Sequence, residues 1–316
     1  MSRDQIIRIA MVVCVVIILC TVIITTTDVF GRSGTGGYTS ADRYTAGGTE
    51  ITAEIRNLDI NWTGGKVTVA FHPEKTVVLE ESAKRSLPED EQLHWWVDGD
   101  TLRVQYAGAG IRLSMPEKEL TLTLPEGIAL EKAAIRLTSG DAEIPAMKAE
   151  KLELSATSGK ITAAAETEKA DIVSTSGDIT VFLPGKTKEI KLGSTSGSIR
   201  LEAGRADKIE AGSTSGSISV TAEECGKLKA GSTSGSICAD LRQLEEADIG
   251  ATSGSVTVRL PEKPGFTAKV DRTSGSFDSD VALTRDGSSY VCGDGSTKVK
   301  IGTTSGNIRI EAAEEK

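Results

Sequence analysis

One tripeptide, Thr-Ser-Gly, recurs at nearly constant spacing along most of the chain and limits what the chain can fold into. It occurs nine times among the 316 residues, and successive glycines are separated by 19, 18, 20, 19, 19, 19, 21 and 31 residues. A repeat built from a pair of helices needs about 33 residues or more, so this period is too short for that class. The period fits one rung of a β-solenoid or of a leucine-rich repeat. The glycines of the nine repeats are Gly140, Gly159, Gly177, Gly197, Gly216, Gly235, Gly254, Gly275 and Gly306.

Apolar residues on both sides of each glycine decide between these two folds. The second and fourth residues after the glycine are apolar and the residue between them is polar, as in Ile218-Ser219-Val220. The seventh and fifth residues before it are also apolar, as in Ile209 and Ala211. Alternation with a period of two is typical of a strand that buries one face, and no repeat carries a helical apolar stripe. Each repeat is therefore predicted to be a strand, a Thr-Ser-Gly corner, a second strand and a polar loop.

The sequence thus predicts an all-β fold, a single-chain, parallel β-helix-like β-solenoid of about ten rungs of about 19 residues each. Equivalent residues of neighbouring rungs stack about 4.8 Å apart, so the isoleucines form continuous buried columns. Glycine is expected at the corner because a sharp bend between strands often needs a positive φ. The regular solenoid is expected over residues 131–316, with an insertion at residues 278–297.

The N-terminus predicts a membrane anchor. Residues 9–27 are uncharged, and with the following residues they form a predicted transmembrane helix at 9–30. Because Arg3 and Arg8 both precede it, residues 1–8 are expected in the cytoplasm and the remainder outside the cell membrane, in a single-pass protein. A cleaved signal peptide has a shorter apolar core and a small-residue exit, which this segment lacks; a buried soluble helix is the alternative. Residues 31–49 are rich in glycine and serine and are predicted to be a flexible tether.

Residues 50–130 are expected to form a degenerate first rung, with Gly65 at its corner, and a capping β-region. Trp95 and Trp96 lie in this region, where they are expected to cap the open end of the solenoid; a sugar-stacking platform is the alternative. Tyr290 lies in the insertion, and insertions on solenoids often carry binding. These three residues are the candidate binding surface.

The run from Leu120 to Ile161, with a "LTLTLP" strand followed by serial "SGxI" rungs, resembles the bacterial putative-adhesin family. This is a widespread β-strand-repeat domain of unknown function, and the resemblance extends from about residue 50 to the C-terminus. It implies a β-helix-like fold, frequent attachment to a membrane anchor and, in some relatives, an association with cell-envelope stress responses. It brings no catalytic residues.

Composition narrows the classes of function further. A net charge of −9 and 4% aromatic residues argue against nucleic acid as a partner, because phosphate binding needs a basic surface. Only two histidines are present, and the five cysteines are scattered, so neither a histidine-based triad nor a metal site nor a disulfide framework is expected. We expect no cofactor and no enzyme activity. A carbohydrate-active β-helix enzyme is the remaining enzymatic alternative, although it needs paired carboxylates that no rung presents.

These observations predict a non-enzymatic, membrane-anchored, extracytoplasmic β-solenoid that serves as an adhesin-like binding module at the cell envelope, with a link to envelope-stress sensing. Its expected partners are the lipid bilayer, through the N-terminal helix, and cell-wall glycan or an envelope protein. A membrane-associated structural scaffold that self-assembles is the alternative.

Overall fold

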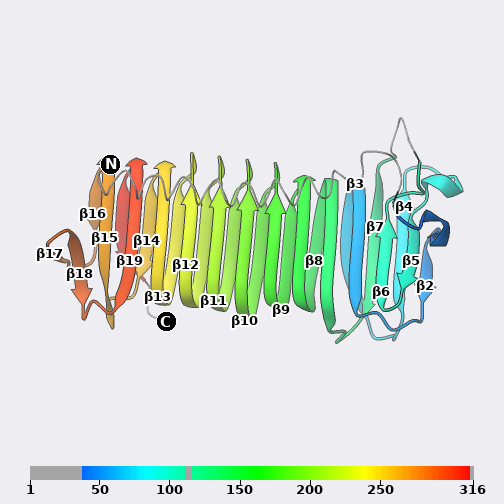
Figure 1. Cartoon of the computed structure of the whole chain (residues 1–316), viewed down its shortest axis with the longest axis horizontal. Helices are drawn as coiled ribbons and strands as arrows, with labels where there is room; N and C mark the ends of the chain where they lie inside the picture. Colours follow the sequence, from blue (N-terminus) through cyan, green and yellow to red (C-terminus); the bar gives the residue numbers. More distant parts are fainter. Residues whose placement is uncertain (1–37, 111–115, 314–316) are drawn as a thin grey trace. The chain divides into compact units, whose positions relative to one another are not determined.

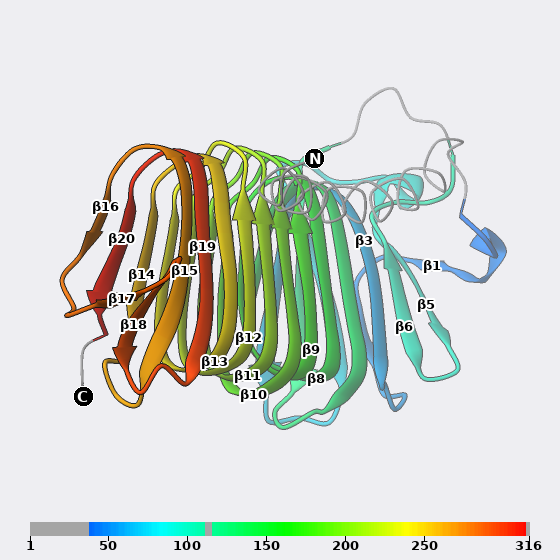
Figure 2. The same cartoon turned by 60° about the vertical axis from the view of Figure 1, so that its left-hand side comes forward.

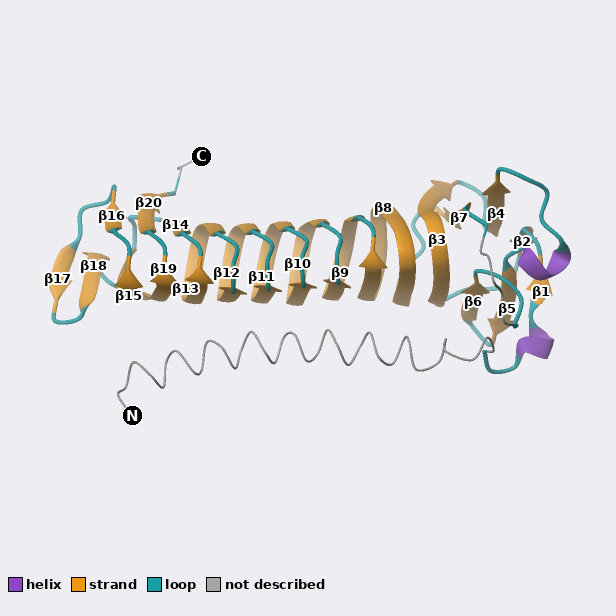
Figure 3. Cartoon of the chain, turned by 90° about the horizontal axis from the view of Figure 1, so that it is seen from above, coloured by secondary structure: helices purple, strands orange, loops and turns teal. Residues whose placement is uncertain are grey.

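The computed structural model describes residues 38–110 and 116–313. The predicted cytoplasmic segment 1–8, the predicted transmembrane helix 9–30 and residues 31–37 of the predicted tether lie outside the described residues. Residues 38–49 of the predicted tether contain a 3-10 turn and two residues that pair with a neighbouring strand at Trp95 and His94, so this part is ordered and not a flexible tether. Within the described ranges, no helix has both the length and the apolar character needed to cross a bilayer. The only helices there are two short 3-10 turns, η1 (Ala41–Arg43) and η2 (Glu89–Glu91), drawn in purple in Figure 3.

The described residues divide into two compact units, an N-terminal unit of residues 38–177 and a C-terminal unit of residues 178–313. Both are built of strands. The strands of the N-terminal unit are β1 (Thr45–Ala46), β2 (Thr49–Ile51), β3 (Asn57–His72), β4 (Val77–Ala83), β5 (His94–Asp98), β6 (Thr101–Gln105), β7 (Lys118–Pro125), β8 (Leu130–Ser158) and β9 (Ile161–Ser174).

The C-terminal unit contains the remaining strands, several of which lie side by side in Figure 1. They are β10 (Ile179–Ser194), β11 (Ile199–Ser213), β12 (Ile218–Ser232), β13 (Ile237–Ser253), β14 (Val256–Leu260), β15 (Gly265–Ser274), β16 (Phe277–Ser279), β17 (Thr284–Asp286), β18 (Ser289–Gly293), β19 (Thr297–Ser305) and β20 (Ile308–Ala312).

Successive rungs of the C-terminal unit stack in parallel register, which confirms the solenoid-like, all-β fold. Ile199 pairs with Ile218, and Ile218 pairs with Ile237. All three isoleucines are at most 1% exposed, so they form one of the predicted buried columns. Burying each such side chain contributes about 1.5–3 kcal/mol, and only a stack of rungs can achieve it because a lone rung has no apolar neighbour.

The segments expected to be polar loops are part of the strands. In β11, Ala203 and Ala206 both point inward, while Arg205 between them is exposed, and pairing with β12 continues through this second bend. The buried side chains at the bend are small alanines, so the sequence of this segment does not look like a hydrophobic strand. Its backbone nevertheless pairs with the next rung. The prediction of a loop here was therefore wrong.

The corner glycines are required chiefly because neighbouring rungs approach closely. A Cβ added to Gly216 would lie 1.9 Å from the carbonyl oxygen of Gly197, and one added to Gly235 would lie 2.0 Å from that of Gly216. Neither of these glycines has a positive φ, whereas Gly159 and Gly275 do, at +119° and +104°. The predicted reason for glycine therefore holds at some corners, and in the middle of the C-terminal unit stacking distance is the reason.

The serine three residues before the glycine explains the longer Ser-Thr-Ser-Gly form of the corner. The buried hydroxyl oxygens of Ser194, Ser213 and Ser232 each accept a hydrogen bond of 2.8 Å from the N–H of the glycine three residues later. A buried N–H without a partner would cost about 1–3 kcal/mol. The serine hydroxyls thus provide a hydrogen-bond acceptor for the glycine N–H at the corner, where the two strands of a rung meet.

The last rung in the sequence is not the last rung in space. β19 pairs with β13 on one side and with β15 on the other, while β20 pairs with β14 and β16. The chain therefore builds the outer rung of this unit first, as β15 and β16, and then returns to fill the layer beneath it (Figure 2). The segment between β16 and β19 forms a hairpin in which β18 pairs antiparallel with both β15 and β17.

The N-terminal unit has the same kind of reordered end. β3, the degenerate first rung, lies between β8 on one side and β6 and β7 on the other. Outside these, β5 pairs antiparallel with β6, and β4 pairs antiparallel with β7. The two-residue β1 and three-residue β2 cover parts of β5 and β4 respectively.

Candidate functional site

The second strand of each rung in the C-terminal unit presents a flat outward face, which we call the second-strand face. Because side chains alternate along a strand, two residues per rung point outward. Register aligns them in two columns that run across β10, β11, β12, β13, β14 and β20. One column is Thr180, Arg200, Ser219, Cys238, Thr257 and Arg309; the other is Phe182, Glu202, Thr221, Asp240, Arg259 and Glu311.

Phe182 is the prominent apolar group of this face. The residue is 48% exposed, and within residues 38–110 and 116–313 it is the only large hydrophobic residue that lies exposed. It lies in register with Glu202 of the next rung, whose carboxylate forms a 3.1 Å ion pair with Arg200. Ser219 and Thr221 follow on the next strand and add hydroxyl groups. An aromatic ring therefore lies beside charged and hydroxyl side chains on one flat surface.

Sequence reasoning did not identify Phe182. The signal was available, since Phe182 falls five residues after Gly177, between the inward positions Val181 and Leu183. In the later repeats this outward position is always polar, from Glu202 to Glu311, so an aromatic residue there departs from the pattern.

The opposite, first-strand face of the C-terminal unit carries charges that neutralise one another. Lys208 lies 3.2 Å from Glu189 of the preceding rung and 2.9 Å from Glu210 of its own, and Lys227 lies 3.1 Å from Glu246. Burial acts to raise the pKa of Glu189, but hydrogen bonds from Lys208 and Lys191 outweigh it and lower that pKa. Each such pair contributes at most about 1 kcal/mol to stability.

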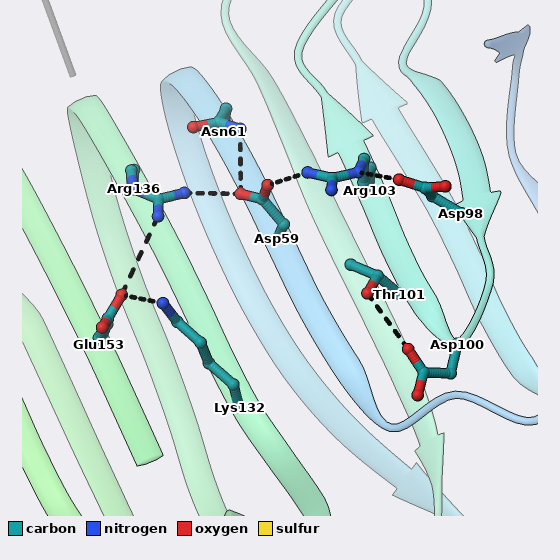
Figure 4. A network of polar contacts seen from close by, with 9 residues as sticks. All are labelled: Asp59, Asn61, Asp98, Asp100, Thr101, Arg103, Lys132, Arg136 and Glu153. Carbon is teal, nitrogen blue, oxygen red and sulfur yellow. Dashed lines mark hydrogen bonds and ion pairs between the residues drawn. The ribbon is translucent and has the colours of Figure 1, made fainter. Parts of the chain in front are cut away.

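A similar network lies on the corresponding face of the N-terminal unit (Figure 4). Asp59 of β3 accepts from Arg103 of β6 at 2.7 Å and from Arg136 of β8 at 2.6 Å. Farther along β8, Glu153 lies 2.8 Å from Lys132. These charges connect three strands and leave little unpaired charge for a ligand.

The predicted site residues Trp95 and Trp96 lie in β5, between β1 and β6 in the N-terminal unit, and both are half-buried. Trp96 packs edge-on against Tyr44 at 5.7 Å, and the guanidinium of Arg43 lies 5.3 Å from its ring centre. Backbone pairing joins Trp95 to Thr45 of β1. The residues just before β1 thus cover part of this tryptophan pair.

Tyr290, the third predicted site residue, lies in β18, remote in sequence from the tryptophans. Its ring packs against Phe277 of β16 with centroids 4.7 Å apart, and its backbone pairs with Ala268 of β15. It is half-buried in this contact. The structure therefore places Tyr290 and the two tryptophans in different units.

The described cysteines differ sharply in accessibility. Cys238 is half-buried and lies on the second-strand face. Cys225 is buried, and burial raises the pKa of its thiol to about 12; burial also raises the pKa of Cys292. In the parts of the chain that the structure describes, no group of three or more His, Cys, Asp or Glu residues could hold a metal ion.

The fold is that of an all-β, solenoid-like repeat domain. Residues 55–311 match the Toastrack DUF4097 family model, so the chain belongs to this family. This confirms the resemblance drawn from the repeats. No curated protein matches the sequence.

Several solved structures are similar to the chain. A putative adhesin from Bacteroides fragilis is 15% identical with a TM-score of 0.45, over 83% of this chain and 95% of that one. A putative cell adhesion protein from Clostridium sporogenes is 13% identical with a TM-score of 0.23, over 84% and 99%. A putative lipid binding protein from Parabacteroides distasonis is 12% identical with a TM-score of 0.44, over 84% and 96%.

Proposed function

We propose that the chain is a non-enzymatic, adhesin-like binding module at the cell envelope, and that the second-strand face of the C-terminal unit binds cell-wall glycan. The observation that carries the proposal is the exposed ring of Phe182 beside the Arg200–Glu202 pair and the hydroxyls of the next rung. The apolar face of a sugar ring packs on an aromatic side chain, while its hydroxyls need nearby donors and acceptors.

The shape of this face supports an extended partner. Solenoids typically bind along the surface formed by successive rungs, because each rung adds an equivalent set of side chains. Here the outward positions repeat at the strand spacing of about 4.8 Å, so a linear polymer that lies across the rungs meets side chains at every rung. The first-strand face supports such a role less well, since among the described residues it exposes no large apolar side chain comparable to Phe182.

The location of the module belongs to the same proposal. The uncharged segment at residues 9–27, preceded by Arg3 and Arg8, supports a single-pass anchor with the solenoid outside the cytoplasm. From that position the binding face reaches the cell wall, and a change in bound glycan becomes a signal for envelope stress.

Binding of the full chain, solubilised in a mild detergent, to purified cell-wall fragments tests this function. Phe182→Ala is expected to weaken binding about tenfold, the equivalent of about 1.4 kcal/mol for one lost ring contact. Lys191→Ala, an exposed change on the first-strand face, is the matched control and is expected to bind normally. Equal binding by the two variants would contradict the assignment of the face. Release of sugar fragments by the wild-type chain would instead indicate the carbohydrate-active alternative.

A further inference from the structure

Four aromatic side chains gather at one place in the N-terminal unit. The ring centres of Tyr38 and Tyr44 lie 4.7 Å apart, and those of Tyr44 and Trp96 lie 5.7 Å apart. Trp95 is the neighbour of Trp96 in β5. Aromatic residues make up only 4% of the chain, so their concentration here departs from its composition. We call Tyr38, Tyr44, Trp95 and Trp96, together with Arg43, the aromatic cluster.

The cluster is assembled from two segments that are distant in sequence. Residues 38–44 supply both tyrosines and the arginine, and β5 supplies both tryptophans. Backbone pairing of Thr45 with Trp95 holds the two segments together. A hydrogen bond of 2.8 Å from the N–H of Gly47 to the carbonyl oxygen of Leu93 adds to this pairing. The described part of the chain therefore begins at the cluster.

The cluster is only partly covered by the rest of the unit. All four of its aromatic residues are half-buried and Arg43 is exposed, whereas Trp62 is buried in the core at 1% exposure. The guanidinium of Arg43 lies 5.3 Å from the ring centre of Trp96. Among the described residues, no carboxylate forms an ion pair with this guanidinium. The cluster thus presents parts of its aromatic residues and an exposed cation to its surroundings.

The cluster is close in sequence to the predicted membrane anchor. Residues 31–37 alone separate Tyr38 from the transmembrane helix predicted at residues 9–30. A segment of that length reaches at most about 25 Å even when it is fully extended. With the anchor of the proposed function in place, Tyr38 therefore lies within this distance of the end of the membrane-spanning helix.

The residue types of the cluster fit the surface of a bilayer. Tryptophan and tyrosine combine an apolar body with a polar end, and they are enriched where hydrocarbon meets water. A guanidinium forms charge-assisted hydrogen bonds with phosphate, which phospholipid headgroups carry. The exposed carboxylate of Asp42 is next in sequence to Arg43 and offsets its charge, so the aromatic rings carry most of the expected contact.

We propose that the aromatic cluster contacts the phospholipid headgroups of the membrane that anchors the chain. Its rings lie among the headgroups, and Arg43 binds their phosphates. The N-terminal unit is then seated on the membrane surface, and Trp95 and Trp96 contact lipid instead of forming a sugar-stacking platform. This contact rests on the anchor in the proposed function but not on glycan binding, which uses the C-terminal unit.

Quenching of tryptophan fluorescence by labelled lipid tests the contact. The full chain is reconstituted into vesicles of phosphatidylcholine and phosphatidylglycerol, with or without a nitroxide on the phosphatidylcholine headgroup, which quenches only rings close to it. We expect the label to quench the emission that Trp95 and Trp96 contribute. The variant W95F/W96F retains only the buried Trp62, and its emission is expected to stay unchanged when the label is added.

Charge reversal tests the part played by Arg43. Arg43→Glu places a second carboxylate beside Asp42 and is expected to reduce the quenching by the lipid label. Arg285→Glu, at an exposed position of β17 in the C-terminal unit, is the matched control and is expected to leave the quenching unchanged. Equal quenching in these two variants contradicts the binding of lipid phosphate by Arg43.

Flotation of the same vesicles separates this contact from the anchor. A chain that floats with the vesicles but shows no quenching of Trp95 and Trp96, or equal fractional quenching in W95F/W96F, overturns the contact and leaves the anchor intact. A chain that does not float contradicts the anchor and, with it, the contact. A change in the tryptophan emission on adding soluble cell-wall fragments, with no effect of the lipid label, would assign the two tryptophans to sugar and also overturn the proposal.

Discussion

The N-terminal unit contains a buried ion pair between Lys118 and Glu81. Of the substitutions considered for this unit, we expect the loss of this pair to lower the free energy of unfolding most. The ammonium of Lys118 is fully buried, 2.6 Å from the Glu81 carboxylate and 2.6 Å from the carbonyl oxygen of Glu91, and it also bonds to the carbonyl of Tyr106. The rings of Trp62 and Tyr106 lie 5.2 Å and 4.2 Å from it. Its charge is thus satisfied from several sides in a dry environment.

Lys118→Met keeps the length and apolar stem of the side chain but removes the charge. It leaves the Glu81 carboxylate buried without its cation, and removing one partner of a buried pair costs about 3–5 kcal/mol. It also takes donors from two backbone carbonyls. We expect Lys118→Met to lower the free energy of unfolding of this unit by about 4 kcal/mol. In the double variant E81Q/K118M no unpaired charge remains, so we expect it to recover about 1–2 kcal/mol.

Urea unfolding followed by tryptophan fluorescence measures this effect, because all three tryptophans, Trp62, Trp95 and Trp96, lie in the N-terminal unit. Lys132→Met is the matched control. Its ammonium forms a 2.8 Å pair with Glu153, but the side chain is 41% exposed, so the change should cost about 1 kcal/mol or less. A cost for Lys118→Met no greater than that of the control, or a double variant less stable than Lys118→Met, would refute the unpaired carboxylate as the cause.

Three further predictions concern the rungs. Gly216→Ala should destabilise the C-terminal unit by about 2 kcal/mol or more in chemical unfolding, since its Cβ would lie 1.9 Å from the Gly197 oxygen; an unchanged midpoint would contradict this. Deleting residues 297–316 removes β19 and β20 from between two rungs, so hydrogen exchange should show lost amide protection at residues 265–279; retained protection would rule out the reordered end. Burial acts to raise the pKa of Glu153, but lysine hydrogen bonds lower it overall. Its stabilisation is therefore fully present above its unfolded pKa near 4.5 and lost as pH falls through the lower folded value, and Glu153→Gln should flatten this acid dependence.

The structure of one rung could be predicted from the sequence because its two strands and its corner lie within a single repeat of about 19 residues. Alternation around each glycine identified the inward columns, and residues such as Ile218 and Ile237 lie there, essentially unexposed. The resemblance drawn from the same repeats is confirmed by the family match. Period and alternation survive in the sequence because every rung must meet an equivalent rung above and below it.

Other features depend on contacts that a single rung does not reveal. The backbone of the preceding rung fills the space beside Gly216. The sequence alone predicted a positive φ as the reason for glycine at this corner, whereas the reason is the lack of room for a side chain. The alanines at the second bend are too small to mark a strand. Cys225 lies at this bend, in register with Ala206, and is buried.

The order of the end rungs could not be predicted from repeat spacing either. The longer separation between Gly275 and Gly306 shows that residues intervene, but not that β19 returns beneath β15. Pairing between strands distant in sequence depends on which strand edges remain open in the folded unit, and repeat spacing does not show which edges these are. Phe182 was missed for a different reason, because the repeat was defined by its inward columns and the outward positions were treated only as polar.

The location of the solenoid inside or outside the cell is the most direct test of the proposed role at the cell envelope. Cys238 is half-buried on the second-strand face, whereas Cys225 and Cys292 are buried with raised thiol pKa values, so a maleimide should react with Cys238 first among them. Intact cells treated with a membrane-impermeant maleimide, with Cys238→Ser as the control, provide the measurement. We predict labelling of intact cells that the control lacks. Labelling of Cys238 only after lysis would place the solenoid in the cytoplasm and contradict a role at the cell envelope.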